Sequence, residues 1–564
     1  MQVSNGLATL AVFALASASL GVPYAGAAQA MGDEGGGADV PIYTDLGDYH
    51  YPVSTDVPLA QTYFDQGLRL YYAFNHAEAI RAFRHAQRLD PACAMCWWGE
   101  ALAWGPNINL PMDRDAGLAA FRAVRYAMSA RGEAQDTERE LIEALAQRYA
   151  PDAPADRSEL DRAYADAMSV LASRYPSDAE VRVLHAEALM DLRPWDYWTA
   201  EGAPQPGIAD ALESLQRVLE TNVNHPGACH FFIHAVEKLH PDRAVPCAER
   251  LAGQMPGAGH LVHMPGHIYI RVGRYAEAIS ANRHAVHADE AYIRDQRPGL
   301  GMYTAGYYPH NYDFLAFAAS MIGRSAEALD AAEKVATLLP RELFGAPGMD
   351  FLEHWSVRPL LARVRFARWS EIEHEPAPPA DRPHSRALWH YARGRALAAT
   401  GDVPGARREL DRLRSIMARP ELQGLKMEFN LSLALLRVAE RVLAGWWAMA
   451  AGDPDQAVAA LREAVLHEDG LLYGEPPEWT VPPRQDLGAV LLLAGRPAEA
   501  ADVFGDDLER FPENGWSLWG LAEAQERQGR PAEASTTRSR FERAWEAADV
   551  DVRAGMAAAL VGSR

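Results

Sequence analysis

Small and large apolar residues recur in a fixed order along much of the chain, separated by polar positions, with a period of about 34 residues. In residues 60–91 (AQTYFDQGLRLYYAFNHAEAIRAFRHAQRLDP), Gly67, Ala79, Phe83 and Pro91 occupy positions 8, 20, 24 and 32 of one unit. This pattern predicts two antiparallel helices joined by a turn. A small residue at positions 8 and 20 lets the helices approach closely, and proline ends the second helix.

The same register recurs toward the C-terminus and predicts an all-α fold. A six-residue turn of the type GRYAEA or GRPAEA precedes the second helix six times, at 273–278, 323–328, 401–406, 452–457, 495–500 and 529–534. The unit resembles the tetratricopeptide repeat (TPR). That resemblance implies a right-handed α-solenoid, a superhelix of antiparallel helix pairs in which positions 2, 5, 9, 12 and 13 of each first helix line a concave groove. Position 8 is glycine and position 20 alanine in further units: Gly266, Gly394, Gly445, Gly488, Ala278, Ala328, Ala406, Ala457, Ala500 and Ala534.

The beginning of the chain has the pattern of a secretory signal peptide. Residues 1–30 contain no charged side chain, and their apolar stretch, 7–22, is shorter than the roughly 20 residues of a membrane span. Small residues at 25–30 fit a cleavage site. We therefore expect a periplasmic or extracellular protein with no transmembrane span in the mature chain, and the alternative is an uncleaved anchor. The predicted divisions are a signal peptide (1–30), an extended lead-in arm (31–58), N-terminal repeats with an irregular insert (59–177), central repeats (178–345) and C-terminal repeats (346–564).

Composition excludes several classes of protein. Hydrophobic residues make up 49% of the 564 residues and charged residues 23%, so most of the chain can form a folded core. The net charge of −22 argues against a nucleic-acid partner, since phosphate binding needs clustered cations. Trp97 follows the pair Cys93 and Cys96 where haem attachment would need histidine, so no haem is expected. The sequence leaves open whether these two cysteines form a disulfide.

Histidines are concentrated in the central repeats. Ten of the 19 lie within 225–310, and the repeat that starts at 259 places three of them at groove positions 2, 5 and 9. Spacings of three and four residues keep side chains on one helix face. The predicted metal-ligating residues are His230, His234, His260, His263, His267 and His310. The predicted ligand-binding residues beside them are Glu187, Asp191, Trp195, Tyr308, Asp313 and His354.

Imidazole and carboxylate are the usual protein ligands of zinc, iron and copper, so this cluster predicts a transition-metal site. Two alternatives remain open, namely a metal-free site for a small molecule or peptide in the groove and a purely structural role. The chain lacks HExxH, G-x-S-x-G and P-loop motifs, so no reaction is predicted. The function expected is binding of a metal or small ligand by an exported solenoid, with a metalloenzyme as its extension. The competing function is a non-catalytic scaffold for a protein partner in the cell envelope.

Four segments of the central repeats carry a more specific resemblance. AEALMDLRPWDYW, HPGACHFFIHAVE, MPGAGHLVHMPGHIYIRVGRY and YYPHNYDF resemble a family of exported bacterial TPR proteins. The resemblance implies the fold and its extent, and it implies no reaction. Its implied functional positions are the same groove residues.

Overall fold

The computed structural model describes residues 40–346 and 348–552. The regular elements of these residues are helices, with three isolated β-bridges between loops, so the predicted all-α fold is confirmed. The predicted signal peptide, 1–30, lies outside the described residues. No helix of the described residues combines the length and the apolar character needed to cross a membrane.

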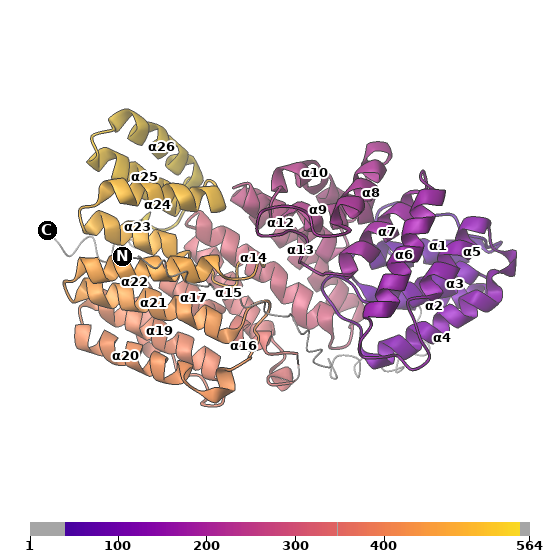
Figure 1. Cartoon of the computed structure of the whole chain (residues 1–564), viewed down its shortest axis with the longest axis horizontal. Helices are drawn as coiled ribbons and strands as arrows, with labels where there is room; N and C mark the ends of the chain where they lie inside the picture. Colours follow the sequence, from indigo (N-terminus) through magenta and orange to yellow (C-terminus); the bar gives the residue numbers. More distant parts are fainter. Residues whose placement is uncertain (1–39, 347, 553–564) are drawn as a thin grey trace, which may run out of the picture.

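The helices follow one another in antiparallel pairs from one end of the molecule to the other (Figure 1). The N-terminal helices are α1 (Pro58–Tyr72), α2 (His76–Leu89), α3 (Ala94–Ala103), α4 (Arg114–Ala130), α5 (Asp136–Ala146) and α6 (Ser158–Arg174). The central helices are α7 (Ala179–Asp191), α8 (Ile208–Thr221), α9 (Pro226–Val236), α10 (Val245–Gln254), α11 (Gly259–His263), α12 (Pro265–Arg271), α13 (Tyr275–Gln296), α14 (Tyr308–Met321) and α15 (Ser325–Leu338). The C-terminal helices are α16 (Phe351–Trp355), α17 (Arg358–Arg365), α18 (Trp369–His374), α19 (Pro383–Thr400), α20 (Val403–Met417), α21 (Ser432–Ala450), α22 (Pro454–Asp469), α23 (Pro483–Leu493), α24 (Pro497–Arg510), α25 (Gly515–Arg527) and α26 (Pro531–Ala544).

Glycines at repeat position 8 mark the closest helix approaches. A Cβ atom on Gly67 of α1 or on Gly99 of α3 would overlap the Phe83 ring, which α2 inserts between those two helices. Gly488 of α23 has the same relation to Phe504 of α24. Larger side chains at these positions would push the helices apart, which is the physical reason for the small residue. The six repeated turns also share a backbone conformation, with φ between +71° and +86° at Gly273, Gly323, Gly401, Gly452, Gly495 and Gly529.

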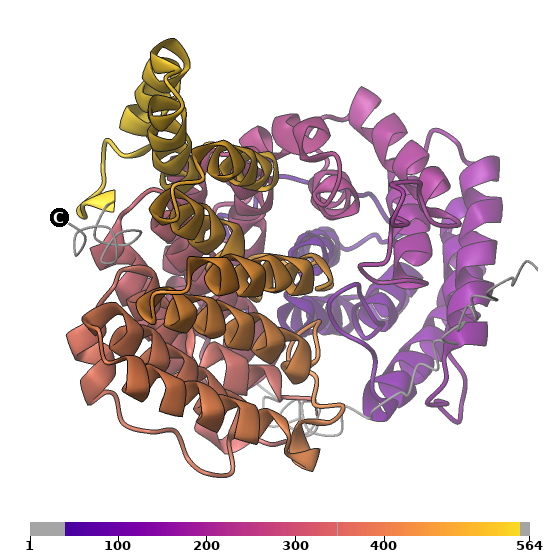
Figure 2. The same ribbon diagram turned by 60° about the vertical axis from the view of Figure 1, so that its left-hand side comes forward.

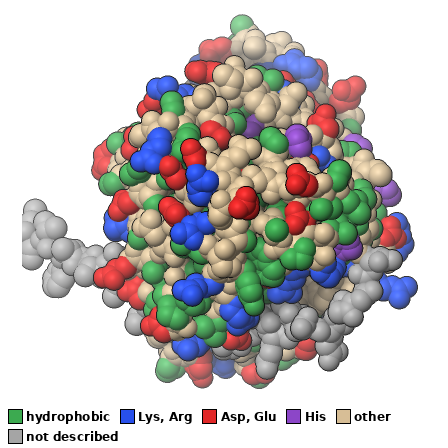
Figure 3. Space-filling view, turned by 90° about the vertical axis from the view of Figure 1, so that its right-hand side faces the viewer, with side chains coloured by type: hydrophobic (Ala, Val, Ile, Leu, Met, Phe, Trp, Pro, Cys, Tyr) green, Lys and Arg blue, Asp and Glu red, His purple; other side chains and the backbone are tan. Residues whose placement is uncertain are grey.

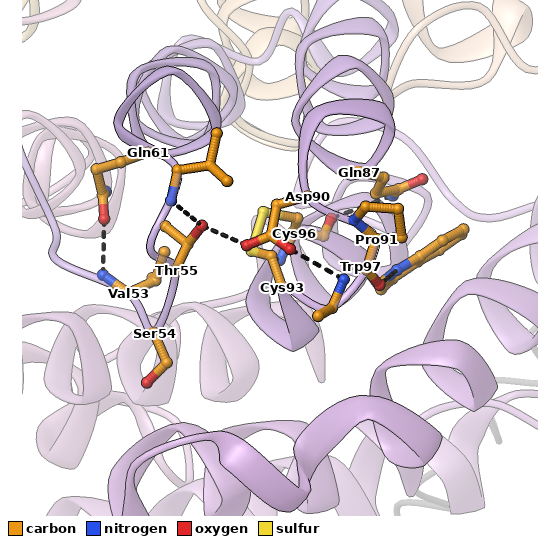
Figure 4. Close-up of a disulfide and its surroundings, with 12 residues drawn as sticks. Val53, Ser54, Thr55, Gln61, Gln87, Asp90, Pro91, Cys93, Cys96 and Trp97 are labelled. Carbon is orange, nitrogen blue, oxygen red and sulfur yellow. Dashed lines mark hydrogen bonds between the residues drawn. A yellow bond between two sulfur atoms is a disulfide. The ribbon is translucent and has the colours of Figure 1, made fainter.

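The described part of the lead-in arm, residues 40–57, lies along the first repeat and is tied to it by hydrogen bonds. The Val53 amide donates to Gln61 Oε1 at 2.9 Å, and Thr55 donates to the Asp90 carboxylate in the turn before α3 (Figure 4). Cys93, which precedes α3, forms a disulfide with Cys96 in its first turn. The pairing that the sequence left open is therefore present, and a second disulfide joins Cys229 to Cys247.

The superhelix closes so that distant repeats touch, as Figure 2 shows for the C-terminal helices beside the central ones. Trp516 of α25 donates its indole N–H to the Ser320 carbonyl of α14 at 2.7 Å. The Asp549 amide donates to the Gly323 carbonyl at 3.1 Å. In an extended solenoid each repeat contacts only its neighbours. Here the closure brings the loop between α22 and α23 against α12, which matters for the candidate site.

Charged side chains are mixed by sign on the face that the N-terminal repeats form. In Figure 3 acidic and basic side chains alternate over this face rather than gathering in separate patches.

Candidate metal centre

The first two candidate ligands lie on α9. Pro226 opens this helix, and the ring of His225 caps it by accepting the Ala228 amide at 3.2 Å. His230 and His234 follow one helical turn apart, so their rings lie on the same face, with centroids 5.0 Å apart. Both side chains are buried.

The next three candidates lie where the chain interrupts a helix. α11 ends at His263, and Pro265 opens α12 after the single residue Met264. His260 and His263 belong to α11, and His267 belongs to α12. Pro265 thus interrupts the helix and is also the first residue of the second helix, a position where its missing N–H costs no hydrogen bond.

The last candidate, His310, comes from α14. A π-helical turn, Tyr303–Tyr307, precedes this helix, and such turns are frequent at functional sites. Pro309 lies in the first turn of α14 next to His310. The His310 ring is 5.0 Å from the His263 ring and, unlike the other five candidates, remains partly exposed.

The structure brings all six predicted metal ligands together. They form two groups, which we call the first triad (His230, His234 and His260) and the second triad (His263, His267 and His310). Within each triad the available ligand atoms lie within 4.8 Å of one another, and the same holds for His234, Glu237 and His267, which connect the triads. Zn–N distances of 2.0–2.1 Å place tetrahedral ligand nitrogens about 3.4 Å apart. Small side-chain shifts would therefore bring the ligand atoms of each triad to the spacing that a bound metal ion requires.

Hydrogen bonds fix the proton on the His263 ring. His263 Nδ1 lies 2.8 Å from Asn282 Oδ1, and Asn282 Nδ2 donates to the Ala278 carbonyl at 2.8 Å. The second bond orients the amide, so the oxygen of Asn282 faces the ring and must accept from it. His263 therefore carries its proton on Nδ1, and its Nε2 presents a lone pair.

His267 is fixed in the same way by two carboxylates. Its Nδ1 lies 3.0 Å from Glu475 Oε2 and 3.2 Å from Glu237 Oε2, so Nδ1 carries a proton. His267 Nε2 then faces His263 Nε2 at 2.9 Å. With neutral rings, two lone pairs oppose each other at this distance. The contact is favourable only when a cation, either an added proton or a metal ion, lies between the two nitrogens.

The first triad also contains unpaired nitrogens. His230 Nδ1 donates to the Tyr72 carbonyl at 2.7 Å, which leaves its Nε2 facing His260 Nε2 at 3.2 Å. His260 Nδ1 and both nitrogens of His234 are buried without a hydrogen-bond partner in the described part of the chain. Buried polar atoms are normally paired, so these call for a ligand.

Burial sets the charge state of these rings. Burial, with repulsion from neighbouring imidazoles, lowers the pKa of His230, His260, His263 and His310 well below the ordinary value, and it lowers the pKa of His234 likewise. These rings are neutral near pH 7, which is the form that binds metals. Burial also acts to lower the pKa of His267, but Glu237 and Glu475 outweigh it and raise the pKa to about 9.

Glu237 and Glu475 were not predicted from the sequence. Glu237 caps the C-terminal end of α9, three residues after His234, so its spacing could have indicated it. Glu475 comes from the loop between α22 and α23, and no local pattern connects it to His267. Glu475 also lines a cavity of about 380 Å³, together with Arg271 and Tyr473, so the cavity reaches the edge of the second triad.

The candidate ligands are buried rather than spread along an open groove. His260, His263 and His267 are at most 3% exposed. The ring of Phe74, from the turn after α1, packs against His230 and His260, and Glu475 covers His267 from the C-terminal side. Closure of the superhelix thus converts the predicted concave surface into an interior site.

Only one of the six predicted ligand-binding residues contacts the triads. The Trp195 ring stands edge-on to His234, with centroids 5.0 Å apart. Glu187 and Asp191 instead lie in a separate cluster, where Tyr71 donates to Glu187 and Arg148 donates to Asp191.

The other three also lie in separate networks. Tyr308 donates to Glu290 at 3.2 Å, and Asp313 pairs with Arg358 at 2.8 Å. His354 Nδ1 meets His384 Nε2 at 2.9 Å, and His354 Nε2 donates to the Glu478 carbonyl at 2.9 Å. Other partners therefore hold these three residues.

Comparison with known proteins agrees with the repeat class. The tetratricopeptide repeat model matches residues 388–412, 486–505 and 515–538, which lie in α19–α20 and α23–α26. The chain therefore contains tetratricopeptide repeats and folds as a TPR-type all-α solenoid. The matched segments do not include the two triads, and no curated protein matches the chain in sequence.

Several solved structures are similar to the chain at low sequence identity and low TM-score. A human IFIT1 dimer with m7Gppp-AAAA is 11% identical over 87% of this chain and 91% of that chain, with a TM-score of 0.31. Ypp1 is 9% identical over 88% and 82%, with a TM-score of 0.45, and yeast Tom70 is 12% identical over 89% and 96%, with a TM-score of 0.26. At these TM-scores the likenesses carry no argument about function.

Proposed function

We propose that this protein binds transition-metal ions, with zinc, iron and copper as the candidates, at the histidines of its central repeats. The observation that carries the proposal is the 2.9 Å approach of His263 Nε2 to His267 Nε2. Asn282 and the two carboxylates hold a proton on the Nδ1 of each ring, so the contact needs a cation between the two Nε2 atoms, which is either an added proton on His267 or a metal ion. A bound metal ion accepts both lone pairs and removes the repulsion.

The ligand set also suits chemistry at the metal. Three histidines leave one position of a tetrahedral ion for water or a substrate, as in catalytic zinc sites, whereas structural sites use four protein ligands. The nearby cavity lined by Glu475 provides a route of the kind that a small molecule needs. A metalloenzyme is therefore the extension of the proposal, with the reaction unspecified.

An exported location is part of the proposal. Both disulfides, Cys93–Cys96 and Cys229–Cys247, support it, because disulfides persist in oxidising compartments such as the periplasm. The uncharged start of the chain, 1–30, has the pattern of a secretory signal.

A binding scaffold for a protein or peptide partner is the second candidate function. The three tetratricopeptide matches favour it, since solenoid repeats form extended binding surfaces. A scaffold would bind its partner without metal, and exchange of buried triad residues would affect it only through the fold.

The test is the metal content of protein purified without a histidine tag, measured by mass spectrometry for the wild type and for His263→Ala and His267→Ala. We expect at least one equivalent in the wild type and a loss in both variants. His390→Ala is the control, because His390 is also buried but pairs with Glu409 outside the triads. Metal well below one equivalent in the wild type, unchanged by the substitutions, would contradict the proposal.

A further inference from the structure

The two triads are distinct in their ligand geometry. Among the described residues, the groups whose ligand atoms lie within 4.8 Å of one another are the two triads and the trio His234, Glu237 and His267. Six imidazoles around one ion would also leave it no open position. The six histidines are thus divided into two sets of three, and three imidazoles are a sufficient ligand set for one ion.

We propose that the cluster holds two metal ions, one in each triad, linked through the carboxylate of Glu237. This inference rests on the proposed metal-binding function and extends it to a two-metal centre. The class of ligand is a pair of divalent transition-metal ions, each bound by three imidazoles.

Hydrogen bonds direct the Nε2 atoms toward their own triad. The Tyr72 carbonyl accepts a hydrogen bond from His230 Nδ1–H, and His230 Nε2 faces His260 in the first triad. Asn282 Oδ1 accepts a hydrogen bond from His263 Nδ1–H, and His263 Nε2 faces His267 in the second triad. Acceptors from separate parts of the chain therefore orient one imidazole pair for each ion.

Glu237 connects the triads through the outer nitrogens of their rings. Its Oε2 lies 3.4 Å from His234 Nδ1 in the first triad and 3.2 Å from His267 Nδ1 in the second. When both Nδ1–H groups turn to this oxygen, the Nε2 atoms of both rings remain for the metals. One carboxylate thus orients a ligand of each ion, which is a known role of residues around metal ligands.

The surroundings of Glu237 show why its carboxylate needs positive charge beside it. The Glu237 side chain is 0% exposed, Oε1 has no hydrogen-bond partner within the described residues, and Oε2 faces His267 Nδ1 at 3.2 Å and His234 Nδ1 at 3.4 Å. An isolated buried carboxylate is costly. With a metal ion on the Nε2 of His234 and of His267, the Nδ1–H groups of both rings would be polarised by the ions and would donate to the Glu237 carboxylate.

The test is a titration of chelator-stripped, untagged wild-type protein with Co²⁺ and, separately, with Zn²⁺. The absorption of tetrahedral Co²⁺ and the heat of Zn²⁺ binding both count the ions without any substitution. We expect two equivalents per chain. His310→Ala should retain one equivalent, His230→Ala should retain one, and the double variant should retain none.

A third single substitution tests the link between the triads through Glu237. Glu237→Gln should keep two equivalents but weaken both by about 10- to 100-fold, because the neutral amide orients each ring less well. Circular dichroism and urea unfolding check the fold of each variant, and the wild-type count stands without them. One equivalent in the wild type, lost in both single variants, would overturn the two-ion centre and keep the metal-binding function. No bound metal would overturn both.

Discussion

Two pairs of buried histidines in this protein have the same nitrogen–nitrogen distance, 2.9 Å, but opposite hydrogen-bond chemistry. In the pair His354–His384, His354 Nε2 donates to the Glu478 carbonyl, His354 Nδ1 accepts from His384 Nε2, and His384 Nδ1 faces the Ser432 hydroxyl at 2.7 Å. Neutral rings satisfy every nitrogen. In the pair His263–His267, both Nδ1–H groups point outward to acceptors, so the two Nε2 atoms face each other and need a cation between them.

The difference shows that proximity alone does not define a metal site. The structural pair is complete without a ligand, because donors and acceptors alternate along it. The pair in the second triad is complete only with a cation between its rings. Residues around the rings, rather than the rings themselves, therefore make the difference between a pair with complete hydrogen bonds and a pair that fits a metal ion.

The largest effect should come from adding metal to chelator-stripped protein. Free zinc at about 1,000 times the dissociation constant should raise the free energy of unfolding by about 4 kcal/mol, because the ion binds only the folded site. Thermal unfolding measures the shift. His384→Ala should retain the zinc-dependent rise, whereas His267→Ala should lose the part of the rise that the ion of the second triad contributes. Equal zinc dependence in the two variants would remove the distinction between the pairs.

The next largest effect should follow replacement of Asn282, whose side-chain amide orients the His263 ring. Asn282→Ala removes the acceptor that holds the His263 proton on Nδ1. We expect zinc affinity to fall about 10- to 100-fold, as for other residues that orient metal ligands. Calorimetric titration measures it. Asn282→Asp keeps an acceptor and should recover much of the affinity, and an unchanged affinity in the alanine variant would show that Asn282 does not orient a ligand.

Acid should destabilise the structural pair. Burial and the nearby Arg358 lower the pKa of His384 to about 3, below the 6.5 of an unfolded histidine. The unfolded chain then binds a proton that the folded chain does not, so stability decreases as pH falls from about 6.5 toward 3. The contribution is at most about 1.4 kcal/mol per pH unit. Urea unfolding at pH 6.5 and pH 5 should show a smaller pH dependence for His384→Gln than for the wild type.

The smallest effect on zinc binding should follow removal of the hydroxyl beside His384. Ser432→Ala leaves His384 Nδ1 without its partner and should lower the free energy of unfolding by about 1–3 kcal/mol, which urea unfolding measures. Its zinc affinity should equal that of the wild type. A loss of affinity as large as that of Asn282→Ala would show that the two networks act as one.

The predictable part of the site followed from the register of single repeats. Groove positions 2, 5 and 9 gave His260, His263 and His267, and the i, i+4 spacing gave His230 and His234. Small residues such as Gly67 and Gly488 fixed the helix pairing, because a Cβ atom there would overlap a phenylalanine ring. These features depend on local helix geometry, which a sequence pattern encodes.

The rest depended on contacts between distant repeats. Glu475 lies 208 residues from His267, and the Tyr72 carbonyl lies 158 residues from His230. Small rotations between successive repeats add up to the closure that joins them, and no local pattern records that sum. For the same reason His354 had a groove position in the sequence but a structural partner in the fold.

Crystallography of untagged, zinc-loaded protein with data collected on both sides of the zinc absorption edge tests the central claim most directly. Our account predicts an anomalous peak between His263 Nε2 and His267 Nε2, with Asn282 and Glu475 still contacting the outer nitrogens of the two rings. No peak at this position, with the two rings hydrogen-bonded directly as in the pair His354–His384, would contradict it.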